Sequence, residues 1–291
     1  MAASHADTAW FLSHPRQQLD TGTARMAYRT VGSGPPLLLV HGWPFSSLSF
    51  RKLARLLAAR FTCYLPDTPG LGETEWGSRT RFGFADQAES MRSFVDRLGL
   101  DAYALLAHDT GATIARQLTL IDGARVQKLV LLDTEIPGHR PPWIPLYQRL
   151  TALPGSALAF CLLLRSALFR RSGMGYGGCF HDPTLLDDDD FLGCFVRPLV
   201  VSPARMQGVI NYLRGIDWPM VDGFARRHAE IRVPVLLVWG ADDPVFPVER
   251  ARPMVGQFPA AAMREIAAAK LLVHEERPRE VAAAVLEFLG S

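Results

Sequence analysis

The sequence predicts an α/β protein with a mainly parallel sheet, helices on both sides of the sheet, and an inserted helical lid. Short apolar runs bounded by turn residues, such as LLLVHG at residues 37–42, are typical of strands buried on both faces. These runs alternate with segments whose apolar residues recur at helical spacing. The alternation stops over residues 137–224, which have helical patches and no convincing strand.

The predicted elements follow one another in a regular order. Two extended segments open the chain, and a Gly-Ser-Gly-Pro-Pro turn separates them from the first apolar run. Ser46 or Ser47 offers an N-cap for a helix with Phe50, Leu53 and Leu57 at helical spacing. The last helix carries Val281, Val285, Phe288 and Leu289 on one face. Strands are expected at 17–20, 24–31, 37–42, 61–67, 103–109, 126–133 and 233–240, and further helices at 84–98 and 111–121.

This pattern predicts one domain with an insertion. Residues 1–136 and 225–291 are expected to form the two parts of the sheet-containing core, and residues 137–224 the lid over its strand ends. The most apolar span, residues 158–169, is short and contains Arg165, which is typical of a buried or lid helix rather than of a membrane crossing.

Composition excludes several classes of protein. The chain has 291 residues, 48% hydrophobic and 21% charged, and a formal charge of +2, which gives no reason to expect a nucleic-acid or membrane partner. Four cysteines without metal-ligand spacing, and a start without signal-peptide features, predict free thiols in the reducing cytoplasm. Because there is no glycine-rich dinucleotide fingerprint and no metal-binding cluster, we expect no cofactor and no metal. The oligomeric state cannot be read from the sequence.

Three polar segments fall at the carboxyl ends of predicted strands, where parallel sheets form ligand sites: HGWP at 41–44, AHDTG at 107–111 and GADDP at 240–244. The second has the pattern small-x-Asp-x-small around Asp109. A sharp strand-to-helix turn strains its central residue and tolerates only small neighbours at these positions. It also exposes the Asp109 side chain beside the helix N-terminus, where the amide of Thr110 can face developing negative charge.

Together these segments resemble the α/β-hydrolase family over nearly the whole chain. With Asp at the turn, the chain is similar to epoxide hydrolases and to haloalkane or haloacid dehalogenases. The resemblance implies that Asp109 is a nucleophile that forms an ester, later hydrolysed by a His-activated water. It implies an oxyanion hole from the amides of Trp43 and Thr110, and Asp243 as the catalytic acid. Asp133 or Glu135 stands where some dehalogenases place that acid instead.

The family pattern breaks at its histidine. Aligning Glu275, Glu276 and Pro278 with the end of the family motif Gly-His-Phe-x-x-Glu-x-x-Pro puts Leu271 at the histidine position. Leucine cannot accept a proton, so three alternatives are open. His274, one helical turn later, swings in as the base; or another histidine, such as His108 or His181, serves; or Asp109 works as an acid or base in a reaction that needs no hydrolysis.

The lid and the turn also depart from the pattern. The segment Asn211-Tyr212-Leu213-Arg214 puts Leu where epoxide hydrolases place a substrate-binding tyrosine, although Tyr212, Tyr147 or Tyr176 could still reach the site. Thr110 stands where dehalogenases carry a halide-binding Trp. The residues expected to line the substrate pocket are Trp43, His108, Tyr176, Tyr212 and Leu271.

These features predict an enzyme for a small or medium apolar substrate, of the epoxide-hydrolase or dehalogenase type. A non-hydrolytic lyase, cyclase or isomerase of a biosynthetic pathway is a close alternative because of Leu271. A ligand-binding member that has lost catalysis is a third.

Overall fold

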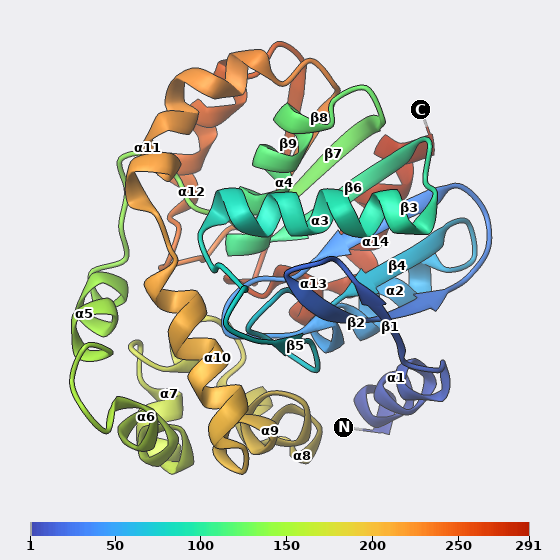
Figure 1. Cartoon of the computed structure of the whole chain (residues 1–291). Coiled ribbons are helices and arrows are strands. Elements are labelled where there is room, and N and C mark those ends of the chain that lie inside the picture. The colour runs from blue at the N-terminus through green and yellow to red at the C-terminus, as the bar shows by residue number, and fades with distance from the viewer. Residues whose placement is uncertain (1, 291) are drawn as a thin grey trace.

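In a computed structural model of the chain, which describes residues 2–290 and the side chains of residues 5–290, the strands form one twisted sheet (Figure 1). Its order is β1-β2-β4-β3-β6-β7-β8-β9, and the short β5 pairs with β2. The strands are β1 (Gln17–Asp20), β2 (Ala24–Val31), β3 (Pro36–Val40), β4 (Thr62–Pro66), β5 (Glu75–Trp76), β6 (Tyr103–His108), β7 (Val126–Leu132), β8 (Val235–Gly240) and β9 (Ala261–Ile266).

The sheet is mainly parallel, as predicted. β4, β3, β6, β7, β8 and β9 pair in parallel, whereas β1, β2 and β5 form an antiparallel edge. Because β3 and β6 are neighbours with Val40 opposite Ala107, the segments that follow these two strands emerge side by side at the same end of the sheet. This pairing brings the predicted HGWP and AHDTG segments together.

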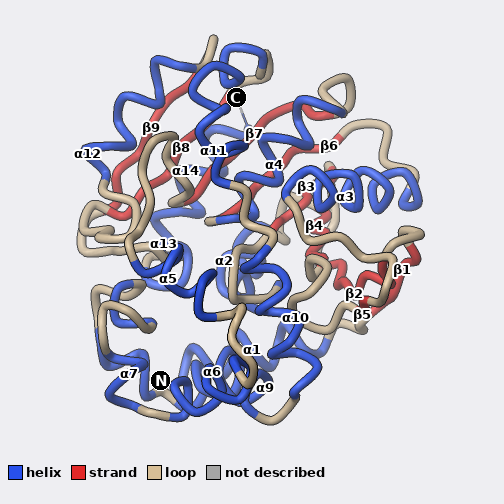
Figure 2. The backbone as a smooth tube through the Cα atoms, turned by 60° about the vertical axis from the view of Figure 1, so that its left-hand side comes forward, coloured by secondary structure: helices blue, strands red, loops and turns tan. Residues whose placement is uncertain are grey.

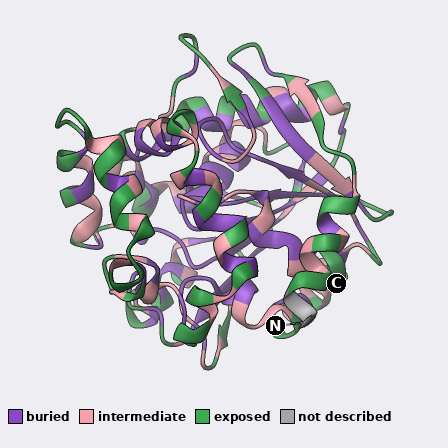
Figure 3. Cartoon of the chain, turned by 90° about the horizontal axis from the view of Figure 1, so that it is seen from below, coloured by how far each residue is buried: buried purple, intermediate pink, exposed green. Residues whose placement is uncertain are grey.

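Helices cover both faces of the sheet, and the strand residues divide between them. Leu38 and Val40 pack with α3 (Phe84–Leu98) and α4 (Thr110–Ile121), while Leu37 and Leu39 pack with α1 (Ala2–Ser13), α2 (Arg51–Leu57) and α14 (Pro278–Gly290). This alternation is the period of two that a strand imposes on its side chains. Burial on both faces explains the continuous apolar runs in the sequence (Figure 3).

Between β7 and β8 the chain forms a helical insertion, and the described residues there contain no strand. It packs beside the sheet and contributes the group of helices at the lower left of Figure 1; Figure 2 shows the same group from another side. The helices are α5 (Trp143–Leu150), α6 (Ser156–Arg165), α7 (Ala167–Arg171), α8 (Asp189–Phe191), α9 (Arg197–Val200), α10 (Pro203–Arg214) and α11 (Trp218–Arg227), with a π-helical turn at Leu192–Val196.

Shorter elements complete the chain. The predicted helix near Ser46 begins as a 3-10 turn at Ser47–Phe50 and continues as α2. The others are α12 (Val248–Ala251), α13 (Val273–Glu276) and 3-10 turns at Tyr176–Gly178, Pro183–Asp187, His228–Glu230 and Arg252–Gln257.

The elements that were not predicted from the sequence include α1 and β9. The segment AASHADTAWFLS of α1 lacks a clear helical stripe and is held through Phe11, which is buried against α2 and the sheet. β9 lies at the edge of the sheet and is only partly covered, so its sequence AAMREI has no apolar run.

The remaining structural expectations concern thiols and membranes. All four cysteines are free. Among the described residues, no helix is both long enough and apolar enough to cross a membrane.

Candidate active site

Asp109 lies in the sharp turn between β6 and α4. Its φ of 51° and ψ of −133° are a conformation that residues with a side chain rarely adopt. The residues around Asp109 must be small, because the turn lies in close contact with the end of β3. A Cβ on Gly111 would lie 2.4 Å from the carbonyl oxygens of Val40 and His41, and a Cβ on Gly42 would lie 2.4 Å from Asp109 Oδ2.

Gly111→Ala is therefore expected to lower the free energy of unfolding by about 1–3 kcal/mol, because the new methyl group forces two backbone segments apart. Gly256→Ala is the matched control, since a Cβ there meets no atom within 4 Å. Urea unfolding of both variants measures the difference. Equal stability of the two variants would contradict the close approach of the turn to β3.

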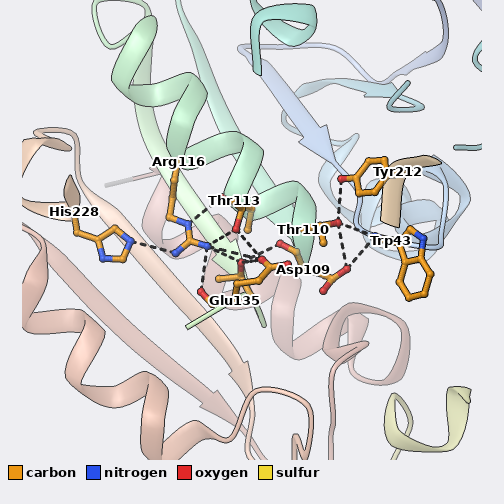
Figure 4. Close-up of polar contacts among 10 residues, drawn as sticks. Trp43, Asp109, Thr110, Thr113, Arg116, Glu135, Tyr212 and His228 are labelled. Atoms are coloured by element: carbon orange, nitrogen blue, oxygen red, sulfur yellow. Dashed lines mark hydrogen bonds and ion pairs between the residues drawn. The ribbon is translucent and has the colours of Figure 1, made fainter. Parts of the chain in front are cut away.

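The Asp109 carboxylate has one fixed oxygen and one free oxygen. The Trp43 backbone N–H donates a hydrogen bond of 2.9 Å to Oδ2, and it also lies 2.9 Å from Thr110 Oγ1. The Tyr212 hydroxyl donates to Thr110 Oγ1 at 3.1 Å (Figure 4). No described residue donates a hydrogen bond to Asp109 Oδ1, so this oxygen is available to react.

The surroundings of Asp109 favour its neutral form. Burial raises the pKa of Asp109 well above its ordinary value, and the negative charge of Glu135 adds to the increase. Hydrogen bonds from the backbone N–H groups of Thr110 and Trp43 act in the opposite direction. No cationic side chain is among the described residues that line the cavity beside Asp109.

That cavity lies between the strand ends and the helical insertion. Asp109, Thr110 and Glu135 form its floor, and the insertion supplies most of its walls. The walls are aromatic and aliphatic, and include Trp143, Ile144, Tyr147, Phe160, Leu164 and Phe169. An apolar cavity with a few convergent polar groups is the usual form of a small-molecule site.

Several polar groups in the walls are already satisfied by the protein. The indole N–H groups of Trp43 and Trp218 donate to Val209 O and Gln148 Oε1, at 3.0 and 2.8 Å. Tyr176 differs, because its buried hydroxyl has no hydrogen-bond partner among the described residues.

Of the predicted pocket residues, Trp43, Tyr176 and Leu271 line the cavity, whereas His108 and Tyr212 do not. The prediction was wrong for His108 because the strand turns its side chain away from the cavity, and its Nε2 donates to Leu271 O at 2.9 Å. Tyr212 lies behind Thr110 and fixes the threonine hydroxyl instead of facing the cavity.

His274, predicted as a catalytic residue, is not among the residues that line the cavity beside Asp109. The ring is completely buried and packs against Phe50 and His108, with ring centroids 4.8 and 4.5 Å apart. Burial lowers its pKa well below the ordinary value, and neither ring nitrogen has a hydrogen-bond partner among the described residues. His181 is half-exposed, 3.0 Å from Asp242, and does not line the cavity either.

Asp243 and Leu271, which the sequence predicts at the site, differ in their relation to the cavity, because Asp243 does not line it. Leu271 lines the cavity. Asp243 Oδ1 accepts the Val245 backbone N–H at 2.7 Å, but Oδ2 has no partner among the described residues. The loop of Asp243 is tied to the segment before Leu271, since the Asp242 N–H donates to Ala269 O at 3.0 Å. Asp133 Oδ2 is likewise unpaired, while its Oδ1 accepts the Gly240 N–H at 2.8 Å.

The buried Asp243 carboxyl gives stability a pH dependence. Burial raises its pKa to about 8, whereas an unfolded aspartate titrates near pH ~3.9. Between these values the folded chain holds the extra proton, so this group's contribution to the free energy of unfolding falls as pH rises. Asp243→Asn is expected to exceed wild type by about 1–3 kcal/mol at pH 8 and by less at pH 5. Urea unfolding at both pH values checks this, and an equal difference at both would contradict it.

Glu135 in the cavity floor forms a buried pair with Arg116, which lies beneath it. Glu135 Oε2 accepts hydrogen bonds from the hydroxyls of Thr113 and Thr134, at 2.8 and 2.9 Å, and lies 3.9 Å from Arg116 Nη2. Sequence reasoning named Glu135 only as an alternative acid and did not single out Arg116. The pairing crosses from α4 to the end of β7, so no local motif signals it.

Comparisons with known proteins agree with this architecture. Residues 35–168 match the family model described as alpha/beta hydrolase fold. The chain is 28% identical to haloalkane dehalogenase 2 of Mycobacterium tuberculosis over 276 residues, 93% of each chain. A stretch of 114 residues, 39% of each chain, is 40% identical to a soluble epoxide hydrolase of a Corynebacterium species. The crystal structure of an alpha/beta hydrolase fold protein from Burkholderia ambifaria superimposes with a TM-score of 0.77 at 26% identity, covering 94% of this chain and 100% of that one.

Proposed function

Because the chain has the α/β-hydrolase fold and is distantly homologous to haloalkane dehalogenases and epoxide hydrolases, we propose that it is an enzyme whose nucleophile is Asp109. Its substrate is a small or medium apolar molecule with an electrophilic carbon. The observation that carries the proposal is the strained turn that presents the Asp109 carboxylate to an apolar cavity, with Oδ2 fixed by Trp43 and Oδ1 free.

The two oxygens suit the two stages of ester chemistry. Oδ1 attacks the substrate carbon, a C–O bond forms, and the leaving group departs with the electrons of its bond. Oδ2 is then the carbonyl oxygen of the ester. When water attacks this carbonyl, negative charge develops on Oδ2, where the N–H groups of Trp43 and Thr110 stabilise it.

The polar groups of the cavity favour an epoxide over an alkyl halide. A departing halide ion needs free N–H donors. The indole N–H groups of Trp43 and Trp218 are engaged with the protein, and of the lining tryptophans only the half-buried Trp143 has no acceptor among the described residues. An opening epoxide needs one donor for its oxygen, and the unpaired hydroxyl of Tyr176 in the cavity wall can supply it. The helical insertion, predicted at residues 137–224, acts in this proposal as a lid that sets substrate range.

A non-hydrolytic reaction is the second candidate. It is favoured by the absence of any histidine among the described residues lining the cavity, and by the raised pKa of Asp109. In that case a neutral Asp109 donates a proton in an elimination, ring closure or rearrangement.

Turnover of a panel of apolar epoxides and haloalkanes in ¹⁸O-water tests the proposal. A hydrolase converts an epoxide into a diol, which is heavier by the elements of water, or converts a haloalkane into an alcohol and a halide ion, with hydroxyl in place of the halogen. An isomer without added water would favour the second candidate, and tight binding of unchanged ligands would favour a binding protein.

A further inference from the structure

We propose that Glu135 is a second catalytic carboxylate, which takes the proton from the water that hydrolyses the Asp109 ester and so replaces the missing histidine. This inference rests on the proposed role of Asp109 as nucleophile.

Glu135 has the placement that this role requires. It lines the same cavity as Asp109, although only 2% of its surface is exposed. Its Oε2 is held by the hydroxyls of Thr113 and Thr134, and no described residue donates a hydrogen bond to Oε1. The Thr134 hydroxyl lies 2.9 Å from both Glu135 Oε2 and the backbone oxygen of Asp109, so one side chain links the two acidic residues. Figure 4 shows Glu135 on the side of Asp109 opposite to Trp43.

Arg116 positions this carboxylate from behind. The guanidinium is completely buried, and its Nη2 donates to Thr113 Oγ1 at 2.6 Å and to Glu135 O at 3.2 Å. Its Nη1 lies 3.2 Å from His228 Nε2. Because Arg116 donates to the two threonines whose hydroxyls hold Oε2, Oε1 is the oxygen of Glu135 that is left to accept a proton.

The other titratable groups fit this role less well. Asp243 and Asp133 do not line the cavity, and neither do His108, His181 and His274. Cys179 does line it, but burial raises the pKa of its thiol and keeps it neutral. Among the described lining residues, Asp109 and Glu135 are the only carboxylates, and Asp109 is itself consumed by the ester bond.

The proposed step balances without any reactant other than water. A water oxygen attacks Cγ of the Asp109 ester while Glu135 Oε1 takes one of its protons. The resulting intermediate collapses, and the bond breaks between Cγ and the ester oxygen, the former Oδ1 of Asp109. That oxygen leaves with the substrate and takes the proton back from Glu135 to become an alcohol. The second water proton stays on Asp109 as a carboxylic acid, which must ionise before the next attack.

Glu135→Gln tests the step, because it keeps the shape and the acceptor for Thr113 while removing the base. We expect the first step to proceed and the second to slow, so turnover falls by about 10²–10⁴-fold. Intact-protein and peptide mass spectrometry should then show a persistent substrate adduct on Asp109. Glu265→Gln, at an exposed ion pair with Arg252, is the matched control and should turn over as wild type.

The outcomes separate this inference from the proposed function. Wild-type turnover by Glu135→Gln overturns the role of Glu135, as does loss of turnover without any adduct in a folded variant. If Asp109→Asn instead turns over normally, the proposed nucleophile itself fails. If Glu135→Gln does not fold, Glu135→Asp is the alternative variant. It keeps a carboxylate near Arg116, but the shorter side chain moves this carboxylate away from the ester. Glu135→Asp should then show the same adduct on Asp109, hydrolysed more slowly than in wild type. Hydrolysis of the adduct at the wild-type rate would overturn the inference.

Discussion

Asp109→Asn is expected to lower turnover of any substrate by at least about 10³-fold while the protein stays folded. The amide has nearly the shape of the carboxylate and can still accept the Trp43 N–H at one oxygen. It lacks the nucleophilic oxygen that corresponds to Oδ1, so no ester forms. The change also removes a buried carboxyl whose ionisation burial opposes, so the variant should be no less stable than wild type.

Steady-state kinetics and urea unfolding of Asp109→Asn measure the two effects. Asp242→Asn is a suitable control, because this half-exposed aspartate pairs only with His181 at the surface end of the neighbouring loop. Undiminished turnover by Asp109→Asn, after mass spectrometry excludes deamidation back to Asp, would remove Asp109 from the mechanism.

Arg116→Met is expected to lower the free energy of unfolding by about 3–5 kcal/mol. Methionine fills a similar volume but leaves the charge of Glu135 buried without its cation. It also removes the N–H groups that serve Thr113, Thr134 and the Glu135 carbonyl. Losing one member of a buried charged pair costs more than losing both, because the survivor cannot be solvated.

A double-mutant cycle with Glu135→Gln tests this account of Arg116. The double variant Arg116→Met/Glu135→Gln should be more stable than Arg116→Met alone, since no buried charge is left unpaired. Strictly additive losses in urea unfolding would show that Arg116 contributes through packing alone, for instance against the ring of Phe224, which lies 4.7 Å from its guanidinium carbon.

The sequence was most informative where local chemistry alone decides structure. The apolar runs marked β3, β4, β6, β7 and β8 correctly, because strands covered on both faces need apolar residues at most positions. The edge strand β9 escaped this criterion because it is half-covered. The turn at Asp109 was recognisable because Gly111 reflects a close approach of backbones that only a residue without a side chain allows.

The interior of the site was less predictable, for physical reasons. His274 stands one turn from the motif position, and only the packing of α13 against Phe50 decides that its ring points into the core. The Arg116–Glu135 pair joins residues from different elements, and either residue alone is an ordinary charged residue in a sequence. Spatial proximity created by the sheet, rather than spacing along the chain, brings Arg116 to Glu135, and of the two only Glu135 lines the cavity.

A single turnover in ¹⁸O-water, with enzyme in excess over an apolar epoxide, shows whether Asp109 forms an ester with the substrate. Attack by Asp109 predicts that the first product carries oxygen from the enzyme, and so no ¹⁸O, while the peptide containing Asp109 gains one ¹⁸O atom. A first product that carries ¹⁸O, with an unlabelled Asp109 peptide, would mean that water attacks the substrate directly and would contradict the account.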